Sequence, residues 1–169
     1  YINDDPDPSR ATVGKVLCIT KIADFESLDT LIRDYKVVHT VIDAHPERRK
    51  ALEFAQRHRA HLCFYIAGIA TKVVQVDDEN VKVDRTTWLD ATFERVRRQR
   101  LVLPVDTPIE YKMHMKASVR VSKEDRSGNP VGRYINSGED HYAHASNYCE
   151  IALVLAAGNG SVEDISGVY

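Results

Sequence analysis

Long hydrophobic runs, a strong excess of one charge and a set of paired cysteines are all missing from this sequence. No apolar segment approaches the roughly 20 residues that a membrane-spanning helix needs, so we expect no membrane span. Lysines and arginines number 23 against 25 aspartates and glutamates, and the net charge of -2 provides no global basic field. A site for a polyanion must therefore be a local patch. The odd number of cysteines, without metal-type spacing, predicts reduced, buried thiols and a cytosolic setting: Cys18, Cys63 and Cys149.

Several motifs of common enzyme classes are also missing. The sequence contains no GxxxxGK[ST] phosphate loop, no GxGxxG after a strand and no GxSxG nucleophile elbow. These absences exclude ATP hydrolysis through that loop and several other large enzyme classes. The HxxxH spacing of zinc sites is missing too, because His141 and His144 are three positions apart with no glutamate between them.

The composition is that of one globular domain. The chain has 169 residues, of which 43% are hydrophobic and 28% charged, and this excludes a disordered, collagen-like or coiled-coil protein. We expect residues 1–157 to form the domain and residues 158–169 to form a flexible tail. Because the chain begins at Tyr1 within a polar, proline-rich segment, we expect it to be a piece of a longer protein.

Strands and helices alternate in the first half of the chain. Runs rich in β-branched or apolar residues predict strands, and apolar residues at helical spacing predict the helices between them. The expected elements are a strand at Val13–Ile22, a helix at Phe25–Tyr35 capped by Asp24, a strand at Val37–Ile42, a helix opened by Pro46 and a strand at His61–Ala67. This order implies at least one crossover connection and hence an α/β fold with a partly parallel sheet covered by helices.

The second half of the chain predicts two hairpins and two further helices. A turn at Asp77–Asn80 separates two short strands, and a helix follows at Thr87–Gln99. Strands at Met113–Val121 and Val131–Ile135 flank a second turn, and a final helix runs from Asp140 to Ala157.

Two aspartates are the candidate catalytic residues. Asp43 follows an apolar strand and precedes a helix, and the carboxyl ends of strands are where α/β proteins place their sites. Asp140 lies at a helix start beside Glu139, with His144 four residues later on the same face. Several acids from distant segments could together hold a divalent cation. The alternative is that both aspartates cap helices.

A basic strand face is the candidate DNA-binding surface. Along the expected strand at Met113–Val121, apolar and basic side chains alternate. One face would carry Lys112, His114, Lys116 and Arg120, which suits a phosphate backbone lying across it. The alternative is a solvated outer face without a ligand.

Taken together, these segments resemble the C-terminal nuclease domain of the large terminase subunit of tailed double-stranded-DNA bacteriophages. The resemblance covers residues 16–157 and is carried by three stretches in the family's order and spacing. They are IADFESLDTLIRDYKVVHTVIDAHPERRKALEFA, YKMHMKASVRV with the G-x-P turn at Gly128–Pro130, and RYINSGEDHYAHASNYCEIAL.

The resemblance implies a ribonuclease-H-like mixed sheet flanked by helices, with an added β-hairpin. It implies a metal-dependent endonuclease that cuts concatemeric genomic DNA with two divalent ions, Mg²⁺ or Mn²⁺. Asp43 matches the family's second acid and Asp140 the third, with Glu139 as a further metal ligand, and His141 and His144 match the histidines of the closing motif. The implied partners are double-stranded DNA, the portal protein, the small terminase subunit and an N-terminal ATPase domain, in the host cytoplasm.

The sequence departs from the family pattern in one respect. The family's first acid lies on the first strand within G-x-D-x-G, and this sequence contains no such segment; Asp4 and Asp5, in a proline-rich loop, are poor replacements. We expect that strand either to lie outside the sequence or to come from another segment. An alternative function is therefore a non-catalytic ribonuclease-H-like module that grips DNA or docks on the portal. A flavodoxin-like small-molecule binder ranks last, because no phosphate-cradling loop is present.

Without the first acid, a polypeptide that begins at Tyr1 is expected not to cut DNA. Incubation of the isolated chain with supercoiled plasmid in Mg²⁺ or Mn²⁺ should leave the plasmid intact on an agarose gel. Detectable nicking by the chain alone would refute this expectation.

Overall fold

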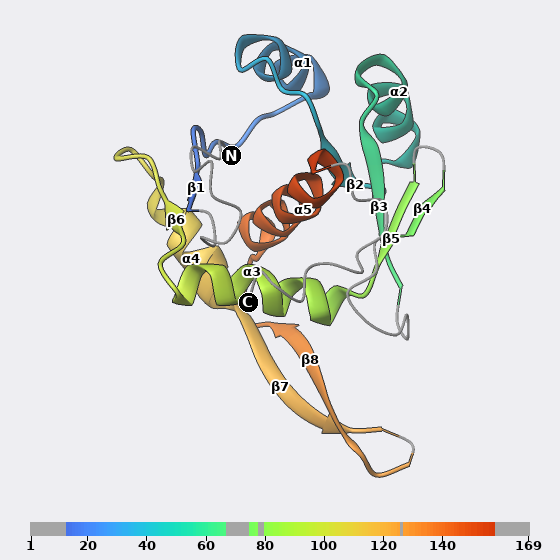
Figure 1. Ribbon diagram of the computed structural model, residues 1–169, viewed down its shortest axis with the longest axis vertical. Helices are drawn as coiled ribbons and strands as arrows, with labels where there is room; N and C mark the ends of the chain where they lie inside the picture. The colour runs from blue at the N-terminus through green and yellow to red at the C-terminus, as the bar shows by residue number, and fades with distance from the viewer. Residues whose placement is uncertain (1–12, 67–74, 78–79, 126, 158–169) are drawn as a thin grey trace.

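The computed structural model describes residues 13–66, 75–77, 80–125 and 127–157, and within them the chain forms a mixed α/β fold of five helices and eight strands (Figure 1). The expected tail at 158–169 lies outside the described residues. The helices are α1 (Phe25–Asp34), α2 (Arg48–His58), α3 (Arg85–Arg97), α4 (Ile109–Ala117) and α5 (His141–Ala156). The strands are β1 (Gly14–Lys15), β2 (Val41–Asp43), β3 (His61–Tyr65), β4 (Gln75–Asp77), β5 (Asn80–Val83), β6 (Leu101–Val102), β7 (Ser118–Glu124) and β8 (Pro130–Asn136).

The central sheet has the strand order β2-β3-β5-β4, with β2, β3 and β5 parallel and β4 antiparallel to β5. The predicted crossover is confirmed, because α2 connects the parallel neighbours β2 and β3. The predicted hairpin around Asp77–Asn80 is confirmed in its paired strands β4 and β5. No helix in the described segments is long and apolar enough to cross a membrane.

Both faces of the sheet are covered, and alternate strand residues point to opposite faces. Val41 and Cys63 face a core shared with α3 and α5, which contribute Trp88 and Ile151. Ile42, Leu62 and Phe64 face the other core, where α1 and α2 supply Phe25, Leu28, Ala51 and Phe54. In Figure 1, α5 passes through the middle of the molecule, between the central sheet and the separate pair β1 and β6.

Local signals place the first helices as expected. The Asp24 carboxylate accepts a hydrogen bond from the Ser27 amide at 2.8 Å, so it caps α1 as predicted. Pro46 lies just before α2, which begins at Arg48. In the same way Asp84 caps α3 through the Thr87 amide, at 2.8 Å.

Two predicted strands are much shorter in the structure. Instead of Val13–Ile22, only Gly14–Lys15 is a strand, paired in parallel with β6 in a separate two-stranded sheet. The pairing ends with Val16, whose amide bonds to Val102, because β6 itself stops short of Pro104. Instead of Val37–Ile42, the strand is Val41–Asp43, since its partner β3 begins only at His61.

The predicted strand at Met113–Val121 is wrong over most of its length. Residues Ile109–Ala117 form helix α4, and β7 begins at Ser118. The helix forms because it buries Tyr111, whose hydroxyl lies 3.2 Å from Ser146 of α5, and a tertiary contact of this kind outweighs an alternating pattern. The expected basic face therefore does not exist as one surface, and its members are spread over two elements: Lys112, His114 and Lys116 on α4, and Arg120 on β7.

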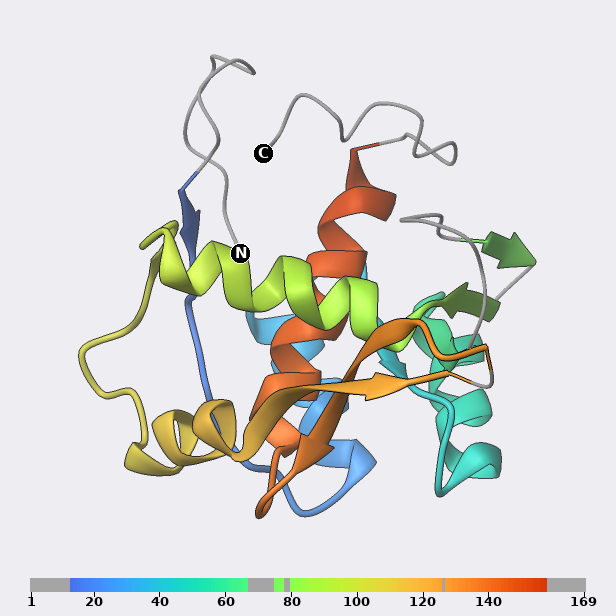
Figure 2. The ribbon, with the colours of Figure 1, turned by 90° about the horizontal axis from the view of Figure 1, so that it is seen from below.

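The hairpin of β7 and β8 projects from the body beside α3 (Figure 1), and both lie in front when the molecule is seen from below (Figure 2). Asp90 of α3 accepts hydrogen bonds from Arg120 and from the Tyr134 hydroxyl, both at 2.8 Å. The Tyr134 ring stacks on Phe93 at 5.4 Å. Gly132 leaves room for Arg120, since a Cβ at that position would collide with the guanidinium. The side chain of Arg120 is thus used for structure.

The expectation of buried thiols is correct for one cysteine only. Cys63 is buried in the core of the central sheet, whereas Cys18 and Cys149 are exposed. All three are free thiols, as predicted. Apolar neighbours in the sequence misled the prediction for Cys149, which is not part of the core that α5 shares with the central sheet.

A buried ion pair joins α3 to α5. The Glu150 carboxylate is 6% exposed and lies 2.8 Å from Arg95 Nε. Among the described residues, its Oε1 atom has no hydrogen-bond partner. Burial raises the pKa of Glu150 to about 7, although the Arg95 charge opposes the rise.

Substitution of Glu150 should therefore change how stability depends on pH. A folded-state pKa above the ordinary value of 4.5 means that the folded protein holds a proton that the unfolded chain has lost. The contribution of Glu150 is fully present below pH 4.5 and is lost as the pH rises to about 7, on the order of 1 kcal/mol per pH unit. Urea unfolding of Glu150→Gln between pH 5 and pH 8 should show a flatter profile than the unaltered protein. Glu53→Gln, at an exposed site, is the control; equal profiles for all three proteins would contradict the prediction.

Candidate functional site

The carboxyl ends of the three parallel strands bring polar side chains to one edge of the central sheet. Asp43 is the last residue of β2, Tyr65 is the last residue of β3, and Arg85 begins α3 directly after β5. Parallel strands end at the same edge of a sheet, and α/β proteins bind ligands there. By strand alternation Asp43 points to the same face as Val41, and Tyr65 to the same face as Cys63, which is the face that α5 covers.

Helix α5 supplies the other half of the site. Asp140, at its N-cap position, is followed at four-residue spacing by His144 and Tyr148, so the three lie along one side of the helix. The predicted pairing of Asp140 with His144 is confirmed, with 3.3 Å between the carboxylate and Nε2. Tyr148 at the far end of this row reaches β2.

Asp43 is exposed and is not a helix cap. Its Oδ2 accepts a hydrogen bond from the Tyr148 hydroxyl at 2.8 Å, and its Oδ1 accepts one from the His45 amide at 2.9 Å. The N-cap residue of α2 is Glu47. The alternative that Asp43 merely caps the following helix is therefore wrong.

Asp140 is almost fully buried, with 7% of its surface exposed. Its Oδ2 lies 3.3 Å from the Ser118 hydroxyl, which donates to it, and 3.9 Å from the Arg85 guanidinium. Although Asp140 occupies the N-cap position, its side chain makes no capping hydrogen bond. Its carboxylate is thus directed at side chains of other elements.

Tyr65 and Tyr148 connect the two aspartates. The Tyr65 hydroxyl lies 3.0 Å from His144 Nδ1 and accepts a hydrogen bond from the Asn147 amide at 2.9 Å. The two tyrosine rings stack with their centroids 5.8 Å apart. Tyr148 is thus bonded to Asp43, Tyr65 is linked through His144 to Asp140, and the stacked tyrosine rings join the two groups. In this set of side chains, the polar network, the two predicted acids lie at opposite ends.

Burial keeps the middle of this network uncharged. It raises the pKa of both Tyr65 and Tyr148, and the nearby Asp43 charge raises both further. Burial also lowers the pKa of His144, an effect that Asp140 opposes and Arg85 reinforces. Two neutral tyrosine hydroxyls and a neutral imidazole thus lie between Asp43 and Asp140.

Glu139 lies apart from this network. Its exposed carboxylate is 3.4 Å from Nε2 of His114 on α4. The His114 ring lies 5.8 Å from that of His141 and 5.0 Å from that of Tyr142. His114, predicted to contact DNA, thus packs between α4 and the start of α5.

The donor set suits a hard divalent ion but is incomplete. Carboxylate oxygens are the ligands that Mg²⁺ prefers, and Asp43 and Asp140 provide them. Among the described residues, no three His, Cys, Asp or Glu side chains gather closely enough to hold a metal ion. The Arg85 guanidinium already faces Asp140. The described residues alone thus do not complete a two-metal site.

Sequence reasoning missed four residues of the site: Tyr65, Arg85, Asn147 and Tyr148. Arg85 could have been found with the rule that identified Asp43, since it follows a predicted strand. Tyr65 could not, because the strand was predicted to continue to Ala67 and ends at Tyr65 in the structure. Tyr148 continues the four-residue spacing of Asp140 and His144. For Asn147, which is fully buried and also accepts a hydrogen bond from Thr92 at 2.9 Å, the sequence offers no signal.

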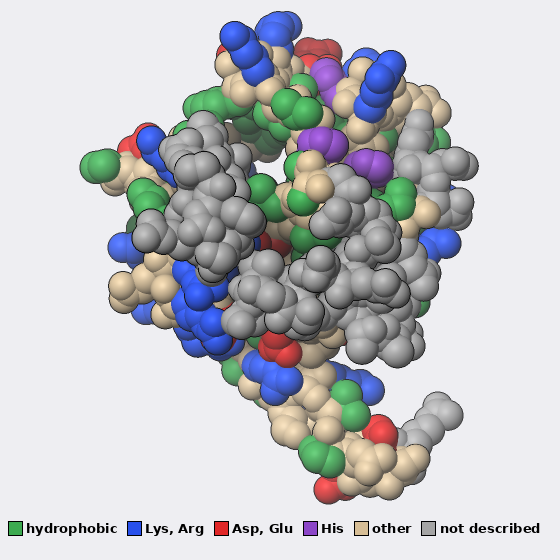
Figure 3. Space-filling model, viewed as in Figure 1, with side chains coloured by type: hydrophobic (Ala, Val, Ile, Leu, Met, Phe, Trp, Pro, Cys, Tyr) green, Lys and Arg blue, Asp and Glu red, His purple; other side chains and the backbone are tan. Residues whose placement is uncertain are grey.

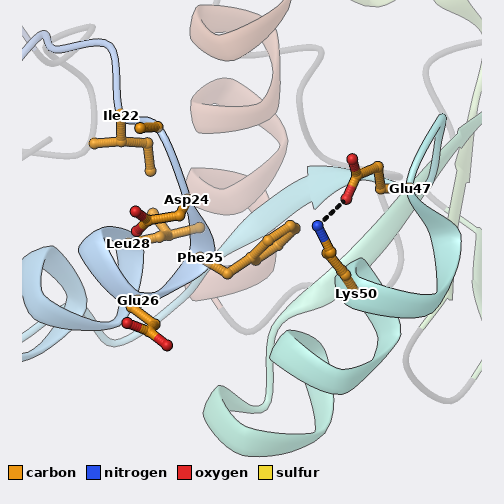
Figure 4. Close-up of a pocket in the computed structure, with 8 residues that line it drawn as sticks. Ile22, Asp24, Phe25, Glu26, Leu28, Glu47 and Lys50 are labelled. Atoms are coloured by element: carbon orange, nitrogen blue, oxygen red, sulfur yellow. Dashed lines mark ion pairs between the residues drawn. The ribbon is translucent and has the colours of Figure 1, made fainter.

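A separate groove of about 610 Å³ lies between the starts of α1 and α2 (Figure 4). Phe25 and Leu28 line it together with Glu26 and Glu47, and its one lysine, Lys50, is paired with Glu47 at 2.9 Å. This acidic lining is unsuited to DNA. In the view of Figure 3, lysine and arginine side chains form several separate groups rather than one stripe.

No protein-family model, curated protein or solved structure matches this chain. The case for a function therefore depends on the residues themselves and on the geometry of the site.

Removal of the Tyr65 hydroxyl should destabilise the protein. In Tyr65→Phe, the fully buried Asn147 amide loses its acceptor, and an unsatisfied buried donor costs about 1–3 kcal/mol. Urea unfolding should show this loss. The control is Tyr142→Phe, whose hydroxyl makes no hydrogen bond within the described part of the chain. Equal stability of the two variants would mean that the network does not hold α5 in place.

Proposed function

We propose that this chain is a nuclease domain of the large-terminase type, which cuts double-stranded DNA by metal-dependent phosphodiester hydrolysis at Asp43 and Asp140. The observation that supports the proposal most is that both acids belong to one set of contacting side chains. They were selected from separate sequence motifs, and they belong to one side-chain network at the carboxyl edge of a parallel sheet. Two metal ions bound there would activate a water molecule and neutralise the leaving oxygen.

The surroundings of each acid suit a distinct task. Asp43 is exposed, and the Tyr148 hydroxyl and the His45 amide fix its orientation, so it can meet a ligand without rearrangement. Asp140 is buried and held by Ser118 and His144, which gives a second carboxylate at a fixed position. Neighbours of this kind hold the two carboxylates in fixed orientations. Catalysis needs reacting groups to be held in this way.

The arrangement of strands supports a ribonuclease-H-like fold that is completed by another segment. Within the described residues, β2 is an edge strand, with β3 on one side only. A further strand paired in parallel on its open side would end at the same edge of the sheet as Asp43. An acid on such a strand would supply the missing metal ligand. Under this proposal the partners are double-stranded DNA, the portal protein, the small terminase subunit and an ATPase domain, and the location is the host cytoplasm.

A non-catalytic module that grips DNA or docks on the portal is the second candidate. The position of Arg85 favours it, because a guanidinium 3.9 Å from Asp140 supplies a positive charge where a metal ion would otherwise be needed. In that case Asp43 and Asp140 would be structural residues.

Manganese binding distinguishes the two candidates without requiring cleavage. The nuclease proposal expects the chain to bind Mn²⁺, and Asp43→Asn and Asp140→Asn each to weaken binding about tenfold or more. Calorimetry or the electron paramagnetic resonance signal of free Mn²⁺ measures this, with circular dichroism to verify folding. Asp34→Asn, an exposed acid on α1, is the matched control. If all four proteins bind Mn²⁺ equally or not at all, the nuclease proposal fails and the non-catalytic module is favoured.

A further inference from the structure

We infer that Arg85 binds a backbone phosphate of the DNA at this site. The inference rests on the proposed function and names the side chain that contacts the substrate. Neither the motifs of the sequence nor the alternating basic pattern pointed to this residue.

The backbone around Arg85 is fixed, while its side chain reaches solvent. The residue follows β5 and the capping residue Asp84, whose carboxylate holds the first turn of α3 through the Thr87 amide. The side chain is 39% exposed. A ligand at the carboxyl edge of the sheet can therefore reach the guanidinium, while the backbone of Arg85 stays in place.

Within the described part of the chain, the guanidinium of Arg85 has only one neighbour at hydrogen-bond distance. One terminal nitrogen, Nη2, lies 3.3 Å from His144 Nε2, and the same nitrogen lies 3.9 Å from Asp140, which is too long for a hydrogen bond. The Nε atom is buried and has no partner among the described residues. Because the side chain as a whole is 39% exposed, a ligand would meet the accessible end of the guanidinium and not Nε.

The chemistry of the site favours a phosphate as that ligand. An arginine presents parallel N–H groups that match two oxygens of a phosphate, and it stays charged at every pH of interest. Within the polar network, Arg85 is the one residue that carries a positive charge, opposite Asp43 and Asp140. A phosphodiester beside the two acids would therefore form an ion pair with the guanidinium of Arg85.

The alternative role for Arg85 is purely structural, to neutralise the buried Asp140. The two roles predict different behaviour in a double variant. If Arg85 only neutralises Asp140, then Asp140→Asn should restore the stability that Arg85→Gln loses. If Arg85 binds phosphate, the double variant should stay weak in DNA binding whatever its stability.

Fluorescence anisotropy with a short labelled DNA duplex, in EDTA over a range of salt concentrations, tests the inference. We expect Arg85→Gln to bind about tenfold more weakly at low salt and to reduce the slope of log K against log salt by about one. Arg85→Lys should keep most of the slope, because it keeps the charge. The control is Arg33→Gln, an exposed arginine on α1, which should bind as the unaltered chain does.

Each outcome of this experiment has a separate meaning. If Arg85→Gln binds the duplex with unchanged affinity and an unchanged salt slope, the inference is overturned. The nuclease proposal is then still decided by the Mn²⁺ measurement. Weaker binding that Asp140→Asn reverses also overturns the inference, in favour of the structural role. Failure of the unaltered chain to bind the duplex overturns the inference together with DNA binding by this chain, whereas the Mn²⁺ measurement still decides whether the two acids form a metal site.

Discussion

Parallel pairing of β2, β3 and β5 is the constraint on which the candidate site depends. Because the three strands run the same way, their carboxyl ends lie at one edge, and Asp43, Tyr65 and Arg85 arrive there together. The two-residue period of each strand then decides which face these side chains take. Val41 and Cys63 fix that choice, since both are buried toward α5. A shift of one residue in the pairing would turn Asp43 and Tyr65 toward α1 and α2 and remove the site.

The docking of α5 on this sheet depends on hydrogen bonds as well as on apolar contact. Asn147 is fully buried and ties three elements together, because it donates to Tyr65 of β3 and accepts from Thr92 of α3. Apolar packing around Ile151 tolerates small displacements, whereas buried polar groups are costly when unpaired. The polar groups therefore fix the position of α5 along the sheet. The row of Asp140, His144 and Tyr148 meets the strand ends because Asn147 lies in the same helix.

The sequence predicted those parts of the fold in which a local signal and tertiary packing agree. Asp24 caps α1, the crossover from β2 to β3 is present, and α5 begins after Asp140 as expected. The prediction failed at α4. The alternating hydrophobic pattern there favoured a strand, but burial of Tyr111 against α5 stabilises a helix. Asp43 was predictable because a strand end is visible in the sequence. Asn147 was not, because its role arises only from the packing of three elements that lie far apart in the chain.

The charge balance of the site and the edge of the sheet point to the same missing component. Asp43 and Asp140 together carry two negative charges, and Arg85 within their network carries one positive charge. Within the described residues the open side of β2 ends at Asp43, with unpaired backbone groups along Val41–Asp43. An added strand would satisfy those groups and, with an acid at its end, bring a third carboxylate beside Asp43. Three carboxylates against one guanidinium would leave two uncompensated negative charges, which a divalent cation would balance. A strand that completes the sheet would thereby also complete the metal site that Asp43 and Asp140 begin.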